Sequence, residues 1–147
     1  MTTPRAGGIA ILDFGSQYTQ VIARRVRELG VYAEVFAPDA AEGAVTAHQP
    51  RGFILSGGPN SVYEAGAPQL PGWLAQRALA GESSLLGICY GMQAMTHAFG
   101  GVVAPSTARE YGQAALRQTA ASPLLRDLPA ELTVWKSHGD RIERPPG

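Results

Sequence analysis

The chain has 147 residues, of which 45% are apolar and 16% are charged. This length suits one ordinary domain, and this composition is typical of a globular protein rather than a disordered one. The formal net charge is zero, so the sequence predicts no electrostatic surface for nucleic acid or for an anionic membrane.

Cysteine usage and hydropathy indicate the compartment. Cys89 is the single cysteine, which excludes an internal disulfide framework and suits a reducing cytosol. Residues 1–5 lead straight into a strand-like run without a signal peptide, and no apolar stretch approaches the length that spans a membrane. We therefore expect a cytoplasmic protein that binds neither nucleic acid nor membrane.

Short apolar runs alternate with helical patterns along most of the chain. In chain order we expect a strand over 9–12, a helix over 18–29, a strand over 31–36, a weakly helical segment over 40–47, a strand over 52–55, a helix over 73–79, a strand over 84–88 and a helix over 92–99. This rhythm predicts an α/β fold with an open, mostly parallel sheet and helices on both of its faces.

The first expected helix carries its apolar side chains on one face, formed by Tyr18, Val21, Ile22, Val26 and Leu29. After Val102 the pattern weakens into short extended pieces, of which 132–135 is the clearest.

The segment Gly87-Ile88-Cys89-Tyr90-Gly91 has the pattern of a nucleophile elbow, because it follows an apolar strand and opens a helix. Here a cysteine stands where hydrolases carry a serine. The flanking glycines lack the Cβ atoms that would clash in so tight a turn. The N-terminus of the helix favours the thiolate, which is the reactive form of the side chain. From the local pattern alone, the alternative is a buried cysteine that fills core space.

Two other segments follow expected strands and are therefore expected beside the elbow. Ligands of open α/β sheets bind at the carboxyl ends of the strands, where residues 13–18 and 56–61 lie. Read alone, the Ser-Gly-Gly-Pro segment at 56–59 is a plain turn. Beside a thiolate, its backbone N–H groups can instead stabilise a developing oxyanion, with the N–H of Tyr90 as second donor.

Five segments together carry a resemblance to a known family. They are 11–18 (ILDFGSQY), 54–59 (ILSGGP), 87–93 (GICYGMQ), 109–112 (REYG) and 135–140 (WKSHGD). With these segments the chain resembles the class I glutamine amidotransferase domain of the GMP synthase family, over residues 9–140. The resemblance implies a class I glutamine amidotransferase-like, flavodoxin-like fold.

The resemblance also implies a glutaminase reaction and a role for particular residues. Cys89 would attack the side-chain amide carbon of glutamine and form a glutamyl thioester, from which water releases glutamate. The backbone N–H groups of Gly58 and Tyr90 would stabilise the oxyanion. The residues that would contact glutamine are Gly57, Pro59, Gln93, Ser137, His138 and Gly139.

A larger enzyme is implied as well. The released ammonia would pass to the ATP-pyrophosphatase domain or subunit of a GMP synthase, a ligase of purine biosynthesis. That partner would use ATP and Mg²⁺ to adenylate XMP and then aminate it to GMP. The glutaminase domain itself is expected to need no cofactor and no metal.

One part of the family pattern is absent from these 147 residues. The family completes its catalytic triad with a His and a Glu in a late GxQFHPE segment, which the sequence does not contain. We expect His48 to be a solvated surface residue, His97 to pack or face solvent within a helix, and His138 to match the family's substrate-loop histidine. The sequence therefore predicts a single glutaminase-type domain over 1–147 that stops before the triad His and Glu.

Two alternatives stay open. The chain could be a non-catalytic or degenerate module that keeps the fold without a complete triad. It could also be another α/β hydrolase with an elbow cysteine, such as a peptidase or a glyoxalase relative, although Gln93 and the segments at 56–59 and 137–140 count against this. Glutamine-dependent release of ammonia would separate these possibilities.

Overall fold

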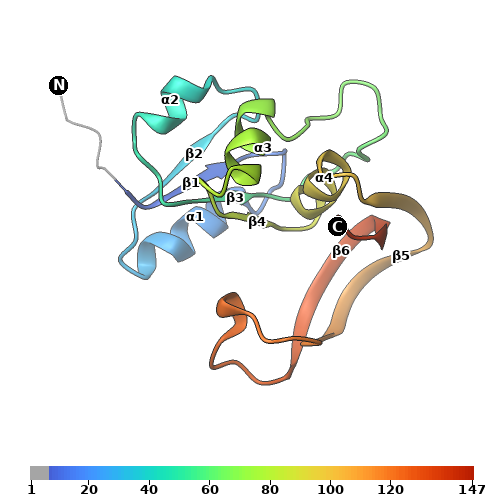
Figure 1. Cartoon of the computed structure of the whole chain (residues 1–147). Coiled ribbons are helices and arrows are strands. Elements are labelled where there is room, and N and C mark those ends of the chain that lie inside the picture. Colours follow the sequence, from blue (N-terminus) through green and yellow to red (C-terminus); the bar gives the residue numbers. More distant parts are fainter. Residues whose placement is uncertain (1–6) are drawn as a thin grey trace.

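The computed structural model describes residues 7–147, except for the side chains of residues 106–111 and 136–139. Its elements in chain order are β1 (Ile9–Leu12), α1 (Thr19–Glu28), β2 (Ala33–Phe36), α2 (Glu42–Thr46), β3 (Gly52–Leu55), α3 (Gly72–Leu79), β4 (Leu85–Gly87), α4 (Tyr90–Ala98), β5 (Val102–Arg117), the 3₁₀ turn η1 (Pro123–Leu125) and β6 (Glu131–Arg144). Figure 1 shows a layered α/β body from which the β5–β6 pair projects. Among the described residues, no helix is both long and apolar enough to cross a membrane.

Four parallel strands form the main sheet in the order β2-β1-β3-β4. In the centre of the sheet, Ile9 of β1 lies opposite Ala33 of β2 on one side and Gly52 of β3 on the other. This is the strand order of a flavodoxin-like sheet, in which the direction of winding reverses between β1 and β3. The predicted open parallel sheet and the predicted order of elements up to α4 are confirmed.

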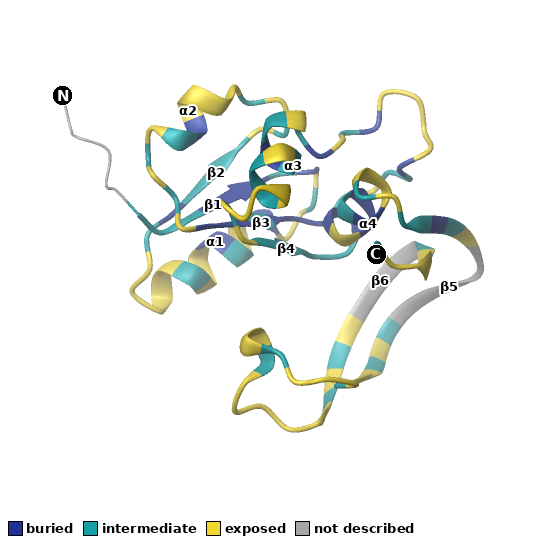
Figure 2. Cartoon of the chain, in the orientation of Figure 1, coloured by how far each residue is buried: buried dark blue, intermediate teal, exposed yellow. Residues whose placement is uncertain are grey.

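Helices cover the two faces of the sheet unequally. On the α1 face, the buried residues are Ile11, Ala23 and Ala33. On the other face, α2, α3 and α4 enclose a larger cluster, whose buried members are Ala10, Leu12, Phe14, Val45, Phe53, Leu55, Val62, Leu70, Leu74, Tyr90, Ala94 and Val103. Figure 2 shows the buried residues gathered along the central strands β1 and β3. The carboxyl ends of these strands are therefore held by the best-packed part of the molecule.

The predicted apolar face of α1 is only partly correct. Ile22 and Val26 pack against the sheet as expected, but Tyr18, Val21 and Leu29 are exposed. The buried residues of this helix are Thr19 and Ala23. Because the core on this face is small, a narrow stripe of side chains is enough to cover it, and the rest of the apolar face meets solvent.

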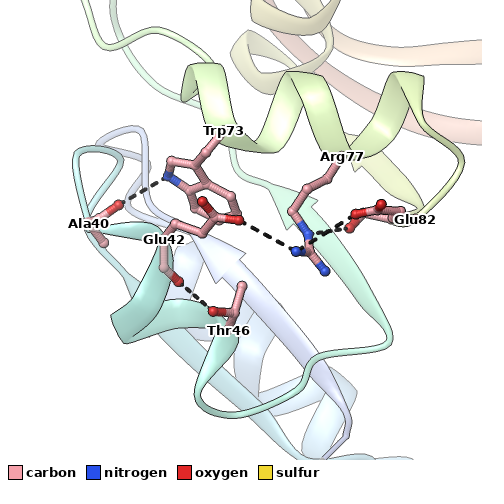
Figure 3. Close-up of polar contacts among 7 residues, drawn as sticks. Ala40, Glu42, Thr46, Trp73, Arg77 and Glu82 are labelled. Atoms are coloured by element: carbon pink, nitrogen blue, oxygen red, sulfur yellow. Dashed lines mark hydrogen bonds and ion pairs between the residues drawn. The ribbon is translucent and has the colours of Figure 1, made fainter.

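Polar contacts hold α2 against α3 on the opposite face (Figure 3). The indole Nε1 of Trp73 donates to the backbone oxygen of Ala40 at 3.3 Å. The guanidinium of Arg77 lies 3.5 Å from the carboxylate of Glu42 and 3.9 Å from that of Glu82. These groups are partly exposed, so the contacts fix the relative position of the helices more than they add to stability.

Strands β5 and β6 pair with each other in an antiparallel arm, defined here as residues 102–144. Leu116 lies opposite Leu132 and Gln113 opposite Trp135, with a shift of register between Pro105 and Glu110. The extended structure predicted at 132–135 is confirmed, but the predicted short pieces are in fact two long strands. The indole of Trp135 is 71% exposed, and an arm that buries so little shows no clear alternation of apolar and polar residues.

Candidate active site

Cys89 lies at the turn between β4 and α4, where it is the residue that caps the N-terminus of the helix. Its backbone dihedral angles are φ 51° and ψ −114°. Non-glycine residues rarely adopt a positive φ, and such conformations gather at functional sites, where the surrounding structure enforces them. The strand, sharp turn and helix of the predicted elbow are present.

Close packing around the turn explains both of its glycines. A Cβ atom on Gly91 would lie 2.2 Å from the carbonyl oxygen of Leu55 in β3. A Cβ atom on Gly87 would lie 2.6 Å from the backbone nitrogen of Met92 in α4. Both distances are far below van der Waals contact, so any side chain would push the helix away from the sheet. The glycines thus fix where the thiol of Cys89 is presented.

A cavity of about 310 Å³ opens in front of Cys89 at the carboxyl ends of three strands. Residues 15–18 line it after β1, residues 57–59 after β3, and Cys89 after β4. This place is the switch point between β1 and β3, where open α/β sheets bind ligands. The structure therefore brings together three of the segments that the sequence singled out.

The loop after β1 is shaped by Asp13. One oxygen of its carboxylate accepts hydrogen bonds from the backbone N–H of Gly15 and from the hydroxyl of Thr19, both at 2.9 Å. The hydroxyl of Ser16 accepts from the N–H of Tyr18 at 3.0 Å. These contacts hold the loop as an ordered turn into α1, so its backbone forms one wall of the cavity.

The glycines of the loop after β3 contact the other two segments directly. A Cβ atom on Gly57 would lie 3.3 Å from the Cβ of Cys89, so this residue sits against the elbow. A Cβ atom on Gly58 would lie 2.1 Å from the carbonyl oxygen of Phe14, so this residue sits against the loop after β1. The sequence predicted the absence of side chains here but not this second contact.

Tyr90 and Gln93 belong to the elbow helix but do not line the cavity with their side chains. The ring of Tyr90 is buried edge-on against Phe14, with ring centroids 5.6 Å apart, and its hydroxyl donates to the backbone oxygen of Pro68. Burial, and to a lesser extent the nearby Glu64 carboxylate, raises the pKa of the Tyr90 hydroxyl. The backbone N–H of Tyr90 still follows Cys89 directly at the first turn of α4.

Gln93 joins the elbow helix to the arm. Its side chain is buried, and its Nε2 donates to the backbone oxygen of Asp140 in β6 at 3.1 Å. The side chains of Lys136, Ser137 and His138 lie outside the described residues. The pairing of β6 with β5 places Ser137 opposite Tyr111.

The two described histidines differ from each other in their surroundings. His48 was predicted to be a solvated surface residue, which was wrong. Its imidazole is 19% exposed, its ring lies 5.5 Å from that of Phe36, and its Nδ1 lies 3.7 Å from the Glu34 carboxylate. His97 is exposed at the end of α4, edge-on to Tyr63 with ring centroids 5.4 Å apart.

The described lining of the cavity contains no histidine. Within the residues that the structure describes, there is also no group of three or more His, Cys, Asp or Glu side chains arranged to hold a metal ion. The described lining offers the Cys89 thiol, backbone groups and the side chains of Ser16, Gln17 and Tyr18.

Solved structures share this fold. A candidate GMP synthase subunit from Thermoplasma acidophilum matches with a TM-score of 0.79 and 28% identity, over 97% of this chain and 69% of that protein. A glutamine amidotransferase from Thermotoga maritima matches with a TM-score of 0.73 and 18% identity, over 96% of this chain and 64% of that protein. The predicted class I amidotransferase-like fold is confirmed.

The sequence itself matches the family model of class-I glutamine amidotransferases over residues 10–147, and the chain belongs to that family. It is 51% identical over 147 residues to the GMP synthase (glutamine-hydrolyzing) of Thermomicrobium roseum, and 55% identical over 139 residues to that of Dehalococcoides mccartyi. These alignments cover 99% and 94% of this chain, but only 27% and 25% of the two relatives. The chain thus spans about a quarter of their length.

Proposed function

We propose that the cavity at Cys89 is a glutaminase site. The thiolate of Cys89 attacks the side-chain amide carbon of glutamine, so that a carbon–sulfur bond forms and the amide nitrogen leaves as ammonia after taking up a proton. Water then attacks the resulting thioester, which releases glutamate and returns the thiol. The observation that carries this proposal is the strained elbow of Cys89 facing a cavity at the switch point, in a chain of this family.

Backbone groups around the cavity complete the proposed site. The N–H groups of Gly58 and Tyr90 stabilise the oxyanion that forms when the thiolate attacks. Gly57 and Pro59 line the cavity and contact the substrate. For Gln93, the bond to Asp140 supports an indirect part in binding, because it ties α4 to the strand that carries Ser137, His138 and Gly139.

The wider reaction rests on the relatives. GMP synthases of about four times this length are its relatives at about 50% identity, so we assign the chain to the glutamine-hydrolysing part of such an enzyme. A synthetase domain or subunit then receives the ammonia and uses ATP and Mg²⁺ to convert XMP to GMP. Such a system works in the cytoplasm, and the glutaminase part needs no cofactor of its own.

Covalent labelling tests the site. A glutamine-like diazo-ketone should attach to Cys89 of the folded chain, and a peptide map should locate the adduct. Cys89→Ser replaces the thiol by a hydroxyl of similar shape and should abolish both labelling and glutamate release. A folded chain that shows no adduct at Cys89, or a Cys89→Ser variant that still releases glutamate at the original rate, would exclude the proposal.

The alternative of a non-catalytic module is favoured by one observation, the absence of histidine from the described lining of the cavity. General-base help contributes about 10²–10⁴-fold to such reactions, and nucleophile and base act as a unit. We therefore predict that the 147 residues alone release glutamate at least about 10²-fold more slowly than a longer version that carries a GxQFHPE segment. Equal turnover by both versions would show that a residue within the 147, such as His138, acts as the base.

A further inference from the structure

Ser56 is a buried polar residue at the end of β3 that the glutaminase reaction does not use directly. Its side chain is 0% exposed. Its hydroxyl oxygen accepts a hydrogen bond from the backbone N–H of Phe14 at 3.0 Å and donates one to the backbone oxygen of Gly57, also at 3.0 Å. One hydroxyl therefore connects the loop after β1 with the loop after β3, and both loops line the cavity.

The bond to Gly57 determines the direction of a second group. The carbonyl of Gly57 and the N–H of Gly58 belong to the same planar trans peptide unit, in which they point in opposite directions. When the hydroxyl of Ser56 holds the carbonyl toward the interior, the N–H must point away from Ser56. Two consecutive glycines would otherwise allow this peptide to rotate, because neither has a Cβ atom to restrict it.

We propose that Ser56 is a positioning residue for the oxyanion site: its hydroxyl fixes the peptide between Gly57 and Gly58 so that the N–H of Gly58 faces the cavity in front of Cys89. This inference rests on the proposed glutaminase function. The orientation of the peptide between Gly57 and Gly58 can nevertheless be observed without glutamine turnover.

The contact with Phe14 strengthens the arrangement. The carbonyl oxygen of Phe14 lies 2.1 Å from where a Cβ of Gly58 would be, and the N–H of Phe14 donates to Ser56. The same two loops are therefore in contact at two points. The ring of Phe14 packs on Tyr90, whose N–H is the second proposed donor. A single buried hydroxyl thus sits where it can set the geometry of both donors relative to Cys89.

The experiment uses three variants of the chain. Ser56→Ala removes the hydroxyl, Ser56→Thr keeps it, and Ser61→Ala removes a hydroxyl further along the same loop. Each is treated with a glutamine-like chloromethyl ketone, whose carbonyl oxygen would occupy the oxyanion position while Cys89 sulfur displaces chloride. Iodoacetamide, which alkylates Cys89 by displacement of iodide without needing those donors, reports the reactivity of the thiol alone.

The readout is the ratio of the two labelling rate constants. Loss of an oxyanion donor costs about 10²–10³-fold, and a donor that can rotate away should lose part of this, so Ser56→Ala should lower the ratio about tenfold. Ser56→Thr and Ser61→Ala should keep it within about twofold. A role in stability alone would lower the melting temperature of Ser56→Ala and leave the ratio unchanged, and that outcome would overturn the proposal.

Two structural measurements separate this inference from the proposed function. A crystal structure of Ser56→Ala should show the peptide between Gly57 and Gly58 rotated or in two orientations; one orientation, as in the parent chain, would overturn the inference whatever the labelling shows. If Ser56→Ala does not fold, NMR spectra of the parent chain provide the test. On adduct formation the amide proton of Gly58 should shift downfield and that of Gly57 should not, and the reverse would overturn the inference. If the parent chain prefers iodoacetamide and ignores the ketone, the glutaminase proposal fails instead.

Discussion

The α/β body and the β5–β6 arm are stabilised by different interactions. The body, residues 9–101, contains all the described fully buried apolar residues except Val103. The arm pairs two long strands with each other and leaves Trp135 and Leu124 exposed at 71% and 63%. Burial of apolar surface therefore stabilises the body, whereas backbone hydrogen bonds hold the arm together.

The two regions meet at the elbow helix. The hydroxyl of Tyr63 donates to the backbone oxygen of Val103 at 2.7 Å, and Gln93 donates to that of Asp140. Cys89, the loop after β3 and the cavity belong to the α/β body, but the segment that is proposed to contact glutamine through Ser137 belongs to the arm. The proposed attack and part of the proposed substrate binding thus lie on two regions that differ in how much apolar surface they bury.

The largest expected difference between the two regions comes from truncating one leucine in each. Leu74 of α3 is 0% exposed within the main core, so Leu74→Ala should lower the free energy of unfolding by about 2–5 kcal/mol. Leu124 in η1 is mostly exposed, and Leu124→Ala should change the free energy of unfolding by less than about 0.5 kcal/mol. Denaturant unfolding of both variants is the measurement. Similar losses would mean that the arm has a core of its own.

A second pair of variants tests the close contacts of the elbow within the body. A methyl group on Gly91 would meet the Leu55 carbonyl oxygen at 2.2 Å, so Gly91→Ala should cost about 1–3 kcal/mol of unfolding free energy and displace Cys89. Gly72, at the start of α3, has open space around it, and Gly72→Ala should be neutral or slightly stabilising. If both variants unfold at the same denaturant concentration, the elbow is not packed as tightly as these contacts indicate.

Much of the body could be predicted because its signals are local. The alternation of apolar runs with helical patterns gave the sheet and the order of its elements. The glycines around Cys89 marked the turn because a strand-to-helix elbow requires them at fixed offsets. The position of the cavity followed from the rule that parallel strands present their carboxyl ends at one edge.

What could not be predicted depends on contacts between distant segments. His48 is half-buried because it packs against Phe36 and lies near Glu34, both on β2. No sequence pattern around residue 48 reveals these contacts. The need for glycine at position 58 comes partly from the carbonyl of Phe14, a neighbour only in the folded chain. The assignment of individual residues to glutamine binding stays a prediction, most clearly for the residues on the arm.

A smaller effect is expected where the body holds the arm. Gln93→Leu keeps the volume of the side chain but leaves the backbone oxygen of Asp140 without its donor, which should cost about 1–2 kcal/mol. Amide hydrogen exchange should accelerate in β6 more than in β1. Gln113→Leu, at an exposed position on the arm, is the matched control and should change neither measurement. Uniform acceleration of exchange in both strands would show that Gln93 stabilises the body rather than the joint.

The smallest expected effect concerns the hydroxyl of Tyr90 and depends on pH. Tyr90→Phe removes the bond to the Pro68 carbonyl and should lower the free energy of unfolding by about 0.5–1.5 kcal/mol at neutral pH. Because burial raises the pKa of this hydroxyl in the folded chain above its ordinary 10.0, the neutral form stabilises the fold. That stabilisation is complete below pH 10.0 and is lost as the pH rises through the raised pKa.

The difference in stability between the parent chain and Tyr90→Phe should therefore be constant at neutral and mildly alkaline pH and should shrink above pH 10.0. The other tyrosines cancel in this comparison, because both chains contain them. Urea unfolding at a series of pH values provides the measurement. A difference that grows as the pH rises would mean that the folded chain favours the phenolate. In that case the hydroxyl of Tyr90 would face solvent or a cation instead of the Pro68 carbonyl, and the ring contact with Phe14 would hold Tyr90 in place without this bond.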